Sequence, residues 1–131
     1  MKSIEHDAFH KCRSLISIEI PAGVDDIRQD TFFRCCNLTN VKLNDGLKSI
    51  YSKAFGHCTN LLSIEIPDSV TNIGYYAFRD CTNLKYAKLP HNLTNIDKFV
   101  FLNCVSLSSI AATKDILDML STETFKYEIN Q

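Results

Sequence analysis

Hydrophobic residues recur along the chain in series that step by 23 residues. One series consists of phenylalanines, and each is followed at intervals of three residues by a cysteine and then a leucine. The members are Phe9, Phe32, Phe55, Phe78 and Phe101; Cys12, Cys35, Cys58, Cys81 and Cys104; and Leu15, Leu38, Leu61, Leu84 and Leu107. Self-similarity at a fixed period of this length is the signature of a repeat protein.

Two further apolar series, two positions apart, predict a strand in each repeat. Side chains alternate along a strand, so the isoleucines of residues 63–66 point to one face, and Ser63 and Glu65 point to the other. Pro67 has no amide hydrogen and closes this strand. The two series are Ile18, Val41, Ile64, Ala87 and Ile110, and Ile20, Leu43, Ile66 and Leu89.

The rest of each unit predicts how the strands are connected. After a polar turn, the pattern V-x-x-I at Val70 and Ile73 predicts a second short extended segment, and A-F-x-x-C at residues 54–58 predicts a tight turn or a single helical turn. One unit has too little apolar surface to fold alone, so units must stack and align equivalent strands. The predicted fold is therefore a β-rich repeat solenoid, with a parallel β-ladder and short second strands.

The two ends of the chain depart from the regular pattern. The repeats cover residues 1–112 as four full units with partial units at the ends, and we expect residues 113–131 to form a C-terminal cap. Thr113 precedes apolar residues spaced for one face of a short helix, namely Ile116, Leu117 and Leu120. At the start of the chain no unit covers Ile4 or Phe9, and an exposed edge of this kind favours end-to-end self-association.

The unit A-F-x-x-C-x-x-L-x-x-I-x-I-P-x-x-V-x-x-I resembles the leucine-rich repeat of BspA-like proteins, from residue 4 to about 112. It departs from that pattern at Thr31 and Val100 in the alanine column, at Asn44 in the proline column and at Ala87 in a core column. The resemblance implies a curved array of leucine-rich repeats, found in surface and secreted proteins of bacteria and microbial eukaryotes. It implies adhesion or protein binding, and neither catalysis nor a cofactor.

Five of the six cysteines lie in the column between a core phenylalanine and a core leucine, where we expect buried thiols that act as small hydrophobes. Equivalent side chains in stacked units point in parallel directions, which disfavours a disulfide. Zinc needs converging pairs of ligands, which this spacing does not supply. Cys36 lies outside the column. Serine at Cys58 would bury a hydroxyl, so we expect alanine there to be less destabilising.

Composition narrows the function further. A net charge of −1 gives no surplus of positive charge for nucleic acid, and the apolar runs are too short to span a membrane. The N-terminal residues are polar where a secretory signal is apolar. The sequence contains no nucleophile elbow, glycine-rich phosphate loop or H-E-x-x-H motif. We expect neither nucleic-acid binding, nor membrane insertion, nor metal binding, nor enzymatic activity.

Two surfaces are candidates for binding a protein partner. The first is the outward face of the strands, which we expect to be concave, and its candidates are Asn40, Lys42, Ser63, Glu65, Tyr86 and Lys88. The column Glu19, Lys42, Glu65 and Lys88 alternates in charge, which suits either a ladder that fixes the pairing of strands or part of a binding surface. Tyr86 combines apolar area with a hydroxyl and is the expected anchor.

The second candidate is an aromatic edge formed by Tyr75, Tyr76 and Phe99. Tyr76 and Phe99 occupy one column, so stacked rings could either cover the edge of the solenoid or form a recognition patch. The predicted function is accordingly a protein-interaction or adhesion module. The alternative is a structural spacer or a fragment of a longer repeat array.

Overall fold

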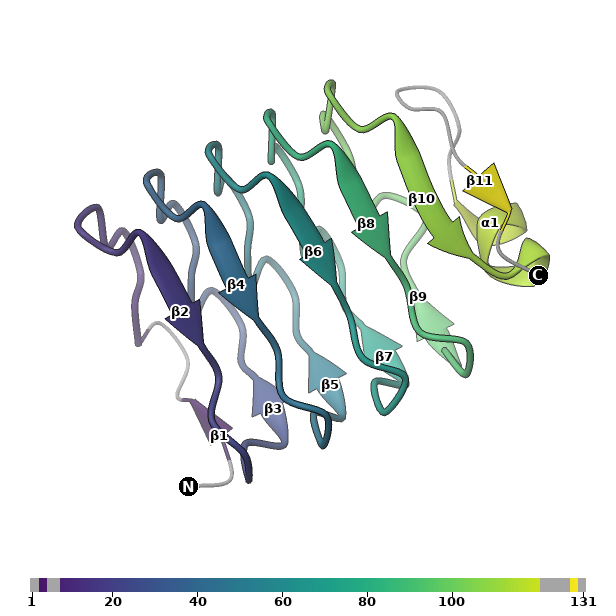
Figure 1. Ribbon diagram of the computed structural model, residues 1–131, viewed down its shortest axis with the longest axis horizontal. Coiled ribbons are helices and arrows are strands. Elements are labelled where there is room, and N and C mark those ends of the chain that lie inside the picture. Colours follow the sequence, from purple (N-terminus) through teal and green to yellow (C-terminus); the bar gives the residue numbers. More distant parts are fainter. Residues whose placement is uncertain (1–2, 5–7, 121–127, 130–131) are drawn as a thin grey trace.

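The structure is a computed structural model, and it describes residues 3–4, 8–120 and 128–129. Its strands form two rows that run the length of a solenoid (Figure 1). The first row contains β2 (Ser17–Glu19), β4 (Asn40–Lys42), β6 (Ser63–Glu65), β8 (Tyr86–Lys88) and β10 (Ser109–Ala112). The second row contains β1 (Ser3–Ile4), β3 (Asp26–Ile27), β5 (Ser49–Ile50), β7 (Asn72–Ile73) and β9 (Asn95–Ile96).

The paired strands within each row are parallel, and register partners are 23 residues apart in sequence. Ile64 of β6 is the partner of Ala87 in β8, and Ile50 of β5 is the partner of Ile73 in β7. The second row forms one sheet, in the order β1-β3-β5-β7-β9. The parallel β-solenoid with a 23-residue period and short second strands is therefore confirmed.

The apolar series fill the space between the two rows. Phe32, Phe55 and Phe78 are fully buried, and the centroids of consecutive rings from Phe9 to Phe101 lie 5.1–5.7 Å apart. Alternation along the strands is as predicted, because Ile64 is buried while Ser63 and Glu65 are exposed. Main-chain hydrogen bonds also join consecutive units at the phenylalanines. Phe32 N–H, for example, donates to the Ala54 carbonyl of the next unit at 2.8 Å.

Departures from the repeat are accommodated locally. Thr31 replaces alanine at a fully buried position, and its hydroxyl donates to the Arg28 carbonyl at 2.8 Å. Asn44 replaces proline, and its amide donates to the Val24 carbonyl at 3.0 Å. The hydrogen bond offsets much of the cost of burying the Thr31 hydroxyl, whereas the buried Oδ1 of Asn44 has no hydrogen-bond partner among the described residues.

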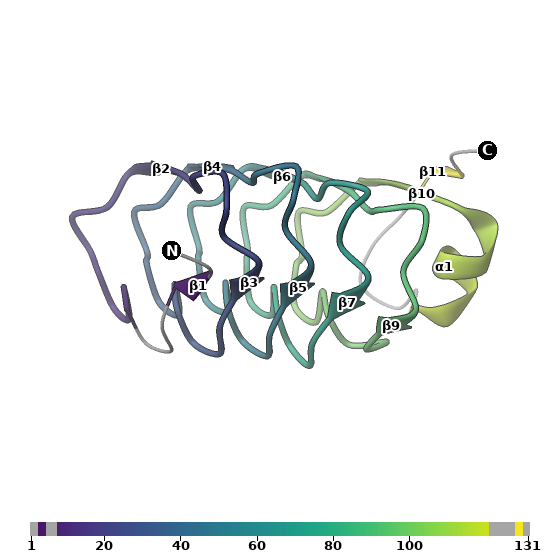
Figure 2. The same cartoon turned by 90° about the horizontal axis from the view of Figure 1, so that it is seen from below.

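The C-terminal end differs from the repeats. The helix α1 (Lys114–Met119) follows β10, and the Thr113 hydroxyl accepts a hydrogen bond from Ile116 N–H at its start. The strand β11 (Glu128–Ile129) pairs with β10, so α1 and β11 lie together at this end of the solenoid (Figure 2). The division into a solenoid of residues 1–112 and a cap of residues 113–131 stays a prediction, and residues 121–127 and 130–131 of that cap lie outside the described residues. No helix in the described part of the chain has the length and apolar character needed to cross a membrane.

Candidate binding surface

The outward side of the first row of strands, here called the strand face, carries two lines of polar side chains. The register brings Glu19 beside Lys42 and Glu65 beside Lys88, as the repeat predicts. The alternating charges nevertheless form no ion pair with one another among the described residues. Both interpretations of this column, a solvated ladder that fixes the strand register and part of a binding surface, stay predictions.

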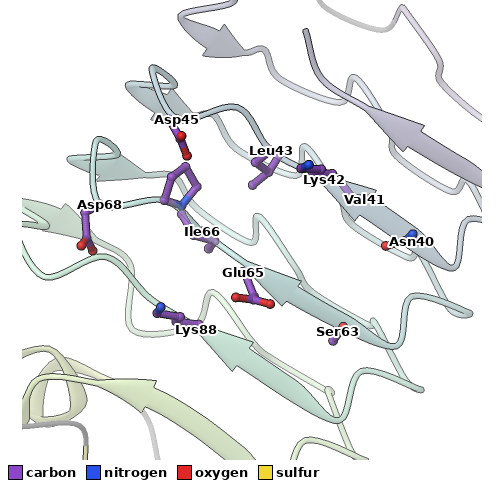
Figure 3. A pocket seen from close by; sticks show the side chains of 11 residues that line it. Asn40, Val41, Lys42, Leu43, Asp45, Ser63, Glu65, Ile66, Asp68 and Lys88 are labelled. Carbon is purple, nitrogen blue, oxygen red and sulfur yellow. The ribbon is translucent and has the colours of Figure 1, made fainter. Parts of the chain in front are cut away.

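A groove of about 480 Å³ crosses the strand face between β4 and β8 (Figure 3). Polar side chains reach it from three strands, and Asp45 and Asp68 reach it from the turns that follow β4 and β6. Five of the six predicted strand-face residues line it: Asn40, Lys42, Ser63, Glu65 and Lys88. The sixth, Tyr86, is half-buried and is not part of the lining, although its register partner Ser63 is.

The groove coincides with an interruption in the sheet. β2 and β4 form one sheet, while β6, β8 and β10 belong to another. Elsewhere the residue after a strand donates to the next unit, as Ile66 N–H does to the Lys88 carbonyl at 2.9 Å. Within the described chain the equivalent bond from Leu43 to Glu65 is not formed. Main-chain donors and acceptors of β4 and β6 are thus left for water or a ligand.

One acidic group that lines the groove, Asp68, is paired with His91. Asp68 accepts hydrogen bonds from the backbone N–H of His91 at 3.1 Å and lies 3.1 Å from the ring atom Nδ1 of His91. The side-chain hydrogen bond with His91 lowers the pKa of Asp68. Asp68 therefore stays ionised down to a lower pH than an isolated aspartate.

The aromatic edge is arranged differently from the prediction. The ring that stacks on Tyr76 is Tyr75, with centroids 3.7 Å apart, whereas no ring contact joins Tyr76 to Phe99 in the described part of the chain. Tyr76 also contacts the guanidinium of Arg79, whose Cζ is 4.6 Å from the ring centroid, and Lys98 Nζ is 5.0 Å from the centroid of Phe99. The backbone is left-handed at Asp30, Lys53 and Tyr76 (φ 61°, 57° and 58°) but not at Phe99, so Tyr76 and Phe99 leave the column from different backbone conformations.

A second groove, of about 590 Å³, adjoins this edge. Tyr75 lines it and is 49% exposed, and Met119 of α1 lines it and is 44% exposed. A side-chain hydrogen bond with Tyr76 raises the pKa of Tyr75, so Tyr75 stays neutral near pH 7. Sequence analysis missed Met119, because its proximity to Tyr75 depends on how α1 packs against the last repeat.

The cysteine column is a structural element. Cys35, Cys58, Cys81 and Cys104 are buried, while Cys12 and Cys36 are half-buried. Each buried thiol donates a hydrogen bond of 3.0–3.2 Å to the carbonyl of the phenylalanine in the preceding unit. Burial raises the pKa of the Cys35 thiol to about 11 and that of Cys58 further. Because the thiolate is the reactive form, Cys35 and Cys58 are poorly reactive.

No cluster of three or more metal-binding side chains is present among the described residues. The polar groups of the strand face are spread over several strands and show no paired nucleophile and base. The arrangement suits contact with an extended polar surface. It does not resemble a pocket built for a small molecule, which is concave and largely apolar.

Comparison with known proteins relates this architecture to a family. Residues 2–130 match the model of the BspA type leucine rich repeat region, in six copies. No curated protein matches the chain in sequence.

Solved structures of bacterial leucine-rich repeat proteins share the fold. The leucine-rich repeat protein of T. pallidum is 33% identical, with a TM-score of 0.81 over 83% of this chain and 51% of its own. The one from Bacteroides ovatus is 29% identical, with a TM-score of 0.78 over 96% of this chain and 39% of its own. A leucine-rich cell surface protein of Faecalibacterium prausnitzii is 26% identical, with a TM-score of 0.64 over 82% of this chain and 38% of its own. The chain thus spans about half or less of the length of these proteins.

Proposed function

The chain belongs to the BspA-type leucine-rich repeat family, and from this premise we propose that it is a protein-binding or adhesion module whose partner docks on the strand face. The repeats act as a non-enzymatic scaffold. Their buried columns fix the positions of the strands, and the outward side chains can differ between units without disturbing the core. This division of labour places partner choice in the outward residues.

The single observation that carries the proposal is the groove at the interruption between β4 and β6. Lys42, Glu65 and Lys88 bring charges of both signs to it without an ion pair among themselves in the described chain. A protein surface presents both carboxylates and ammonium groups, which could pair with these side chains. Tyr86 stands next to the groove on β8, where it would add apolar contact area.

The test uses proteins retained by the immobilised chain, each purified and titrated separately by calorimetry. We expect a saturable partner whose affinity falls at least about tenfold when Lys42, Glu65 and Lys88 are replaced by serine. Tyr86→Ala should weaken the same complex by about 1–2 kcal/mol. Stability should be nearly unchanged, because the three charged groups are solvated.

The matched control replaces residues of the aromatic edge, as Tyr75→Ala with Phe99→Ala. Retained affinity in this control supports the strand face. Loss of binding in the control alone moves the site to the aromatic edge, and a partner insensitive to both sets, or no saturable partner, favours a structural spacer.

End-to-end self-association is a second candidate, supported by the open N-terminal edge. Phe9 and Leu15 pack against the core but stay partly accessible, whereas their equivalents Phe55 and Leu61 are fully buried. On this side β2 pairs only with β4 among the described strands, so its outer edge can accept another strand. Sedimentation of the wild type and of Phe9→Ala should show association that weakens in the variant, whereas a wild-type monomer at high concentration would contradict it.

A further inference from the structure

Charge is segregated between the two sets of turns that flank the first row of strands. The turns that precede the strands, residues 10–16, 33–39, 56–62 and 79–85, carry five cationic side chains and one carboxylate, which is Asp80. The cations are Lys11, Arg13, Arg34, Arg79 and Lys85. The turns that follow the strands carry three carboxylates, Asp25, Asp45 and Asp68, and one lysine, Lys48.

The two sets of turns form rows at opposite ends of the strands (Figure 1). We call the row that precedes the strands the basic rim. Its cations belong to the first, second and fourth units, and the spacing between units is set by the stacked core rings at 5.1–5.7 Å. The basic rim is therefore an extended line of positive charge.

The one carboxylate of the basic rim is neutralised from within. Asp80 lies 3.0 Å from His57 Nε2 and 3.2 Å from Arg79 Nε, and it accepts a hydrogen bond of 2.8 Å from the Asn103 amide. Lys11, Arg13, Arg34 and Lys85 are exposed. Their positive charge is thus not cancelled by the only acid in the same turns.

Besides burial, nearby cations lower the pKa of His57. Burial is the main cause that lowers this pKa, and Arg34, Arg79 and Lys53 lower it further, against the opposing effect of Asp80. Arg34 and Arg79 of the basic rim, together with Lys53 just before it, therefore make the electrostatic potential at His57 more positive. Fields of this kind attract anions.

An aromatic face lies in the middle of the rim. The half-buried ring of Phe33 rests over Gly56, where an added Cβ would be 3.0 Å from Phe33 Cδ1. The ring has His10 and His57 on its two sides at 5.4 and 5.2 Å, and the Arg34 guanidinium lies 5.3 Å from its centroid. The absence of a side chain at Gly56 lets the Phe33 ring pack directly against the turn of the next unit.

We propose that the basic rim binds an acidic polysaccharide, through its sulfate or carboxylate groups on the cations and a sugar ring on Phe33. A linear polyanion can meet cations of several units at once, whereas a small anion meets only one or two. Because His10, His57 and Arg34 approach the Phe33 ring, a sugar would contact only the accessible part of this half-buried side chain, which offers it apolar area. A nucleic acid duplex is disfavoured, because it needs a broad basic surface, whereas the cations here lie along one edge and the opposite row of turns is acidic.

The experiment measures the affinity of the whole chain for heparin, a sulfated polysaccharide, with neutral dextran and poly-glutamate as comparisons. We expect heparin binding that weakens steeply between about 50 and 200 mM salt, and no binding of dextran. The pair Arg13→Ser and Arg34→Asn should weaken heparin binding at least about tenfold. Asparagine is chosen because the Arg34 backbone is left-handed, at φ 62°.

A matched pair, Lys48→Ser with Lys114→Ser, removes the same net charge away from the rim and should leave the affinity unchanged. Phe33→Ser should weaken heparin binding more than poly-glutamate binding. The proposal is overturned if heparin does not bind, or if the two charge pairs weaken it equally. It is also overturned if poly-glutamate binds as tightly as heparin, which would make the rim a site for acidic peptides.

Discussion

The first repeat and the third have almost the same core residues, yet they are buried to different degrees. Phe55, Cys58 and Leu61 of the third unit are fully buried, whereas Phe9, Cys12 and Leu15 of the first are only partly covered. The sequence of a unit therefore does not decide its own burial. In a solenoid each unit is covered by its neighbours, and a unit with a neighbour on one side has half of that cover.

The largest expected effect comes from truncating the same core ring in the two units. Phe55→Ala should lower the free energy of unfolding by about 3–5 kcal/mol, because it opens a cavity inside a stacked column. Phe9→Ala should cost about 1–2 kcal/mol, since much of that ring is already accessible to water. Urea denaturation of both variants measures the difference.

Phe55→Leu serves as a milder control if Phe55→Ala does not fold, and it should still cost more than Phe9→Leu. Equal losses at the two positions would mean that the first unit is as well covered as the third. In that case end-to-end association would already be complete under the conditions of the measurement.

The thiols test the same comparison through chemistry. Under native conditions the half-buried Cys12 and Cys36 should react with a thiol reagent, and the four buried cysteines should react at least about a hundredfold more slowly, a difference of about 2.7 kcal/mol. All six should react after denaturation without reductant. Mass spectrometry of the labelled peptides identifies the sites, and a Cys58 that reacts as fast as Cys12 would show that the middle units open as easily as the first.

The repeat period made most of the fold predictable from the sequence. Residues one period apart became register partners in both rows, and alternation placed Ile64 inside and Glu65 outside. Five of the six predicted strand-face residues also line the groove. These features follow from spacing alone, because stacking converts a period in sequence into a line in space.

Features that depend on atomic positions between units could not be predicted. The interruption between β4 and β6 arises from small shifts of the backbone, and no pattern in the sequence marks it. Tyr76 stacks on Tyr75 and, in the described part of the chain, not on Phe99, whose backbone lacks the left-handed conformation that Asp30, Lys53 and Tyr76 share. The contacts of Met119 depend on the packing of α1, which lies beyond the regular repeats.

A smaller effect distinguishes serine from alanine in the cysteine column. The thiol of Cys58 donates to the Phe32 carbonyl at 3.1 Å, so a serine hydroxyl there has an acceptor. We now expect Cys58→Ser to cost about 1 kcal/mol and Cys58→Ala about 1–2 kcal/mol, the reverse of the order expected from the sequence. Chemical denaturation measures both, and a Cys58→Ser variant less stable than Cys58→Ala would show that the hydroxyl does not reach the carbonyl.

The same column gives a control in the first unit. Cys12 is half-buried, and among its described contacts its thiol lies 3.9 Å from the Ser14 hydroxyl. Cys12→Ser should therefore change the free energy of unfolding by less than about 0.5 kcal/mol. A loss as large as that at Cys58 would mean that Cys12 is covered in solution by another unit.

Two lysines with nearly equal φ angles allow a last comparison between the first unit and the middle of the solenoid. Lys11 in the first unit and Lys53 in the middle are left-handed, at φ 58° and 57°, and both N–H groups donate to the next unit, to the carbonyls of Phe33 and Tyr75. Glycine removes the strain of this conformation but increases the entropy of the unfolded chain, so Lys53→Gly should add about 0.5–1 kcal/mol to global stability. Lys11→Gly should slow amide exchange in residues 8–20 and leave global unfolding unchanged, because a unit covered on one side opens before the rest. Hydrogen exchange with parallel urea denaturation separates the two effects, and an equal rise in global stability for both variants would show that the first unit unfolds together with the middle of the solenoid.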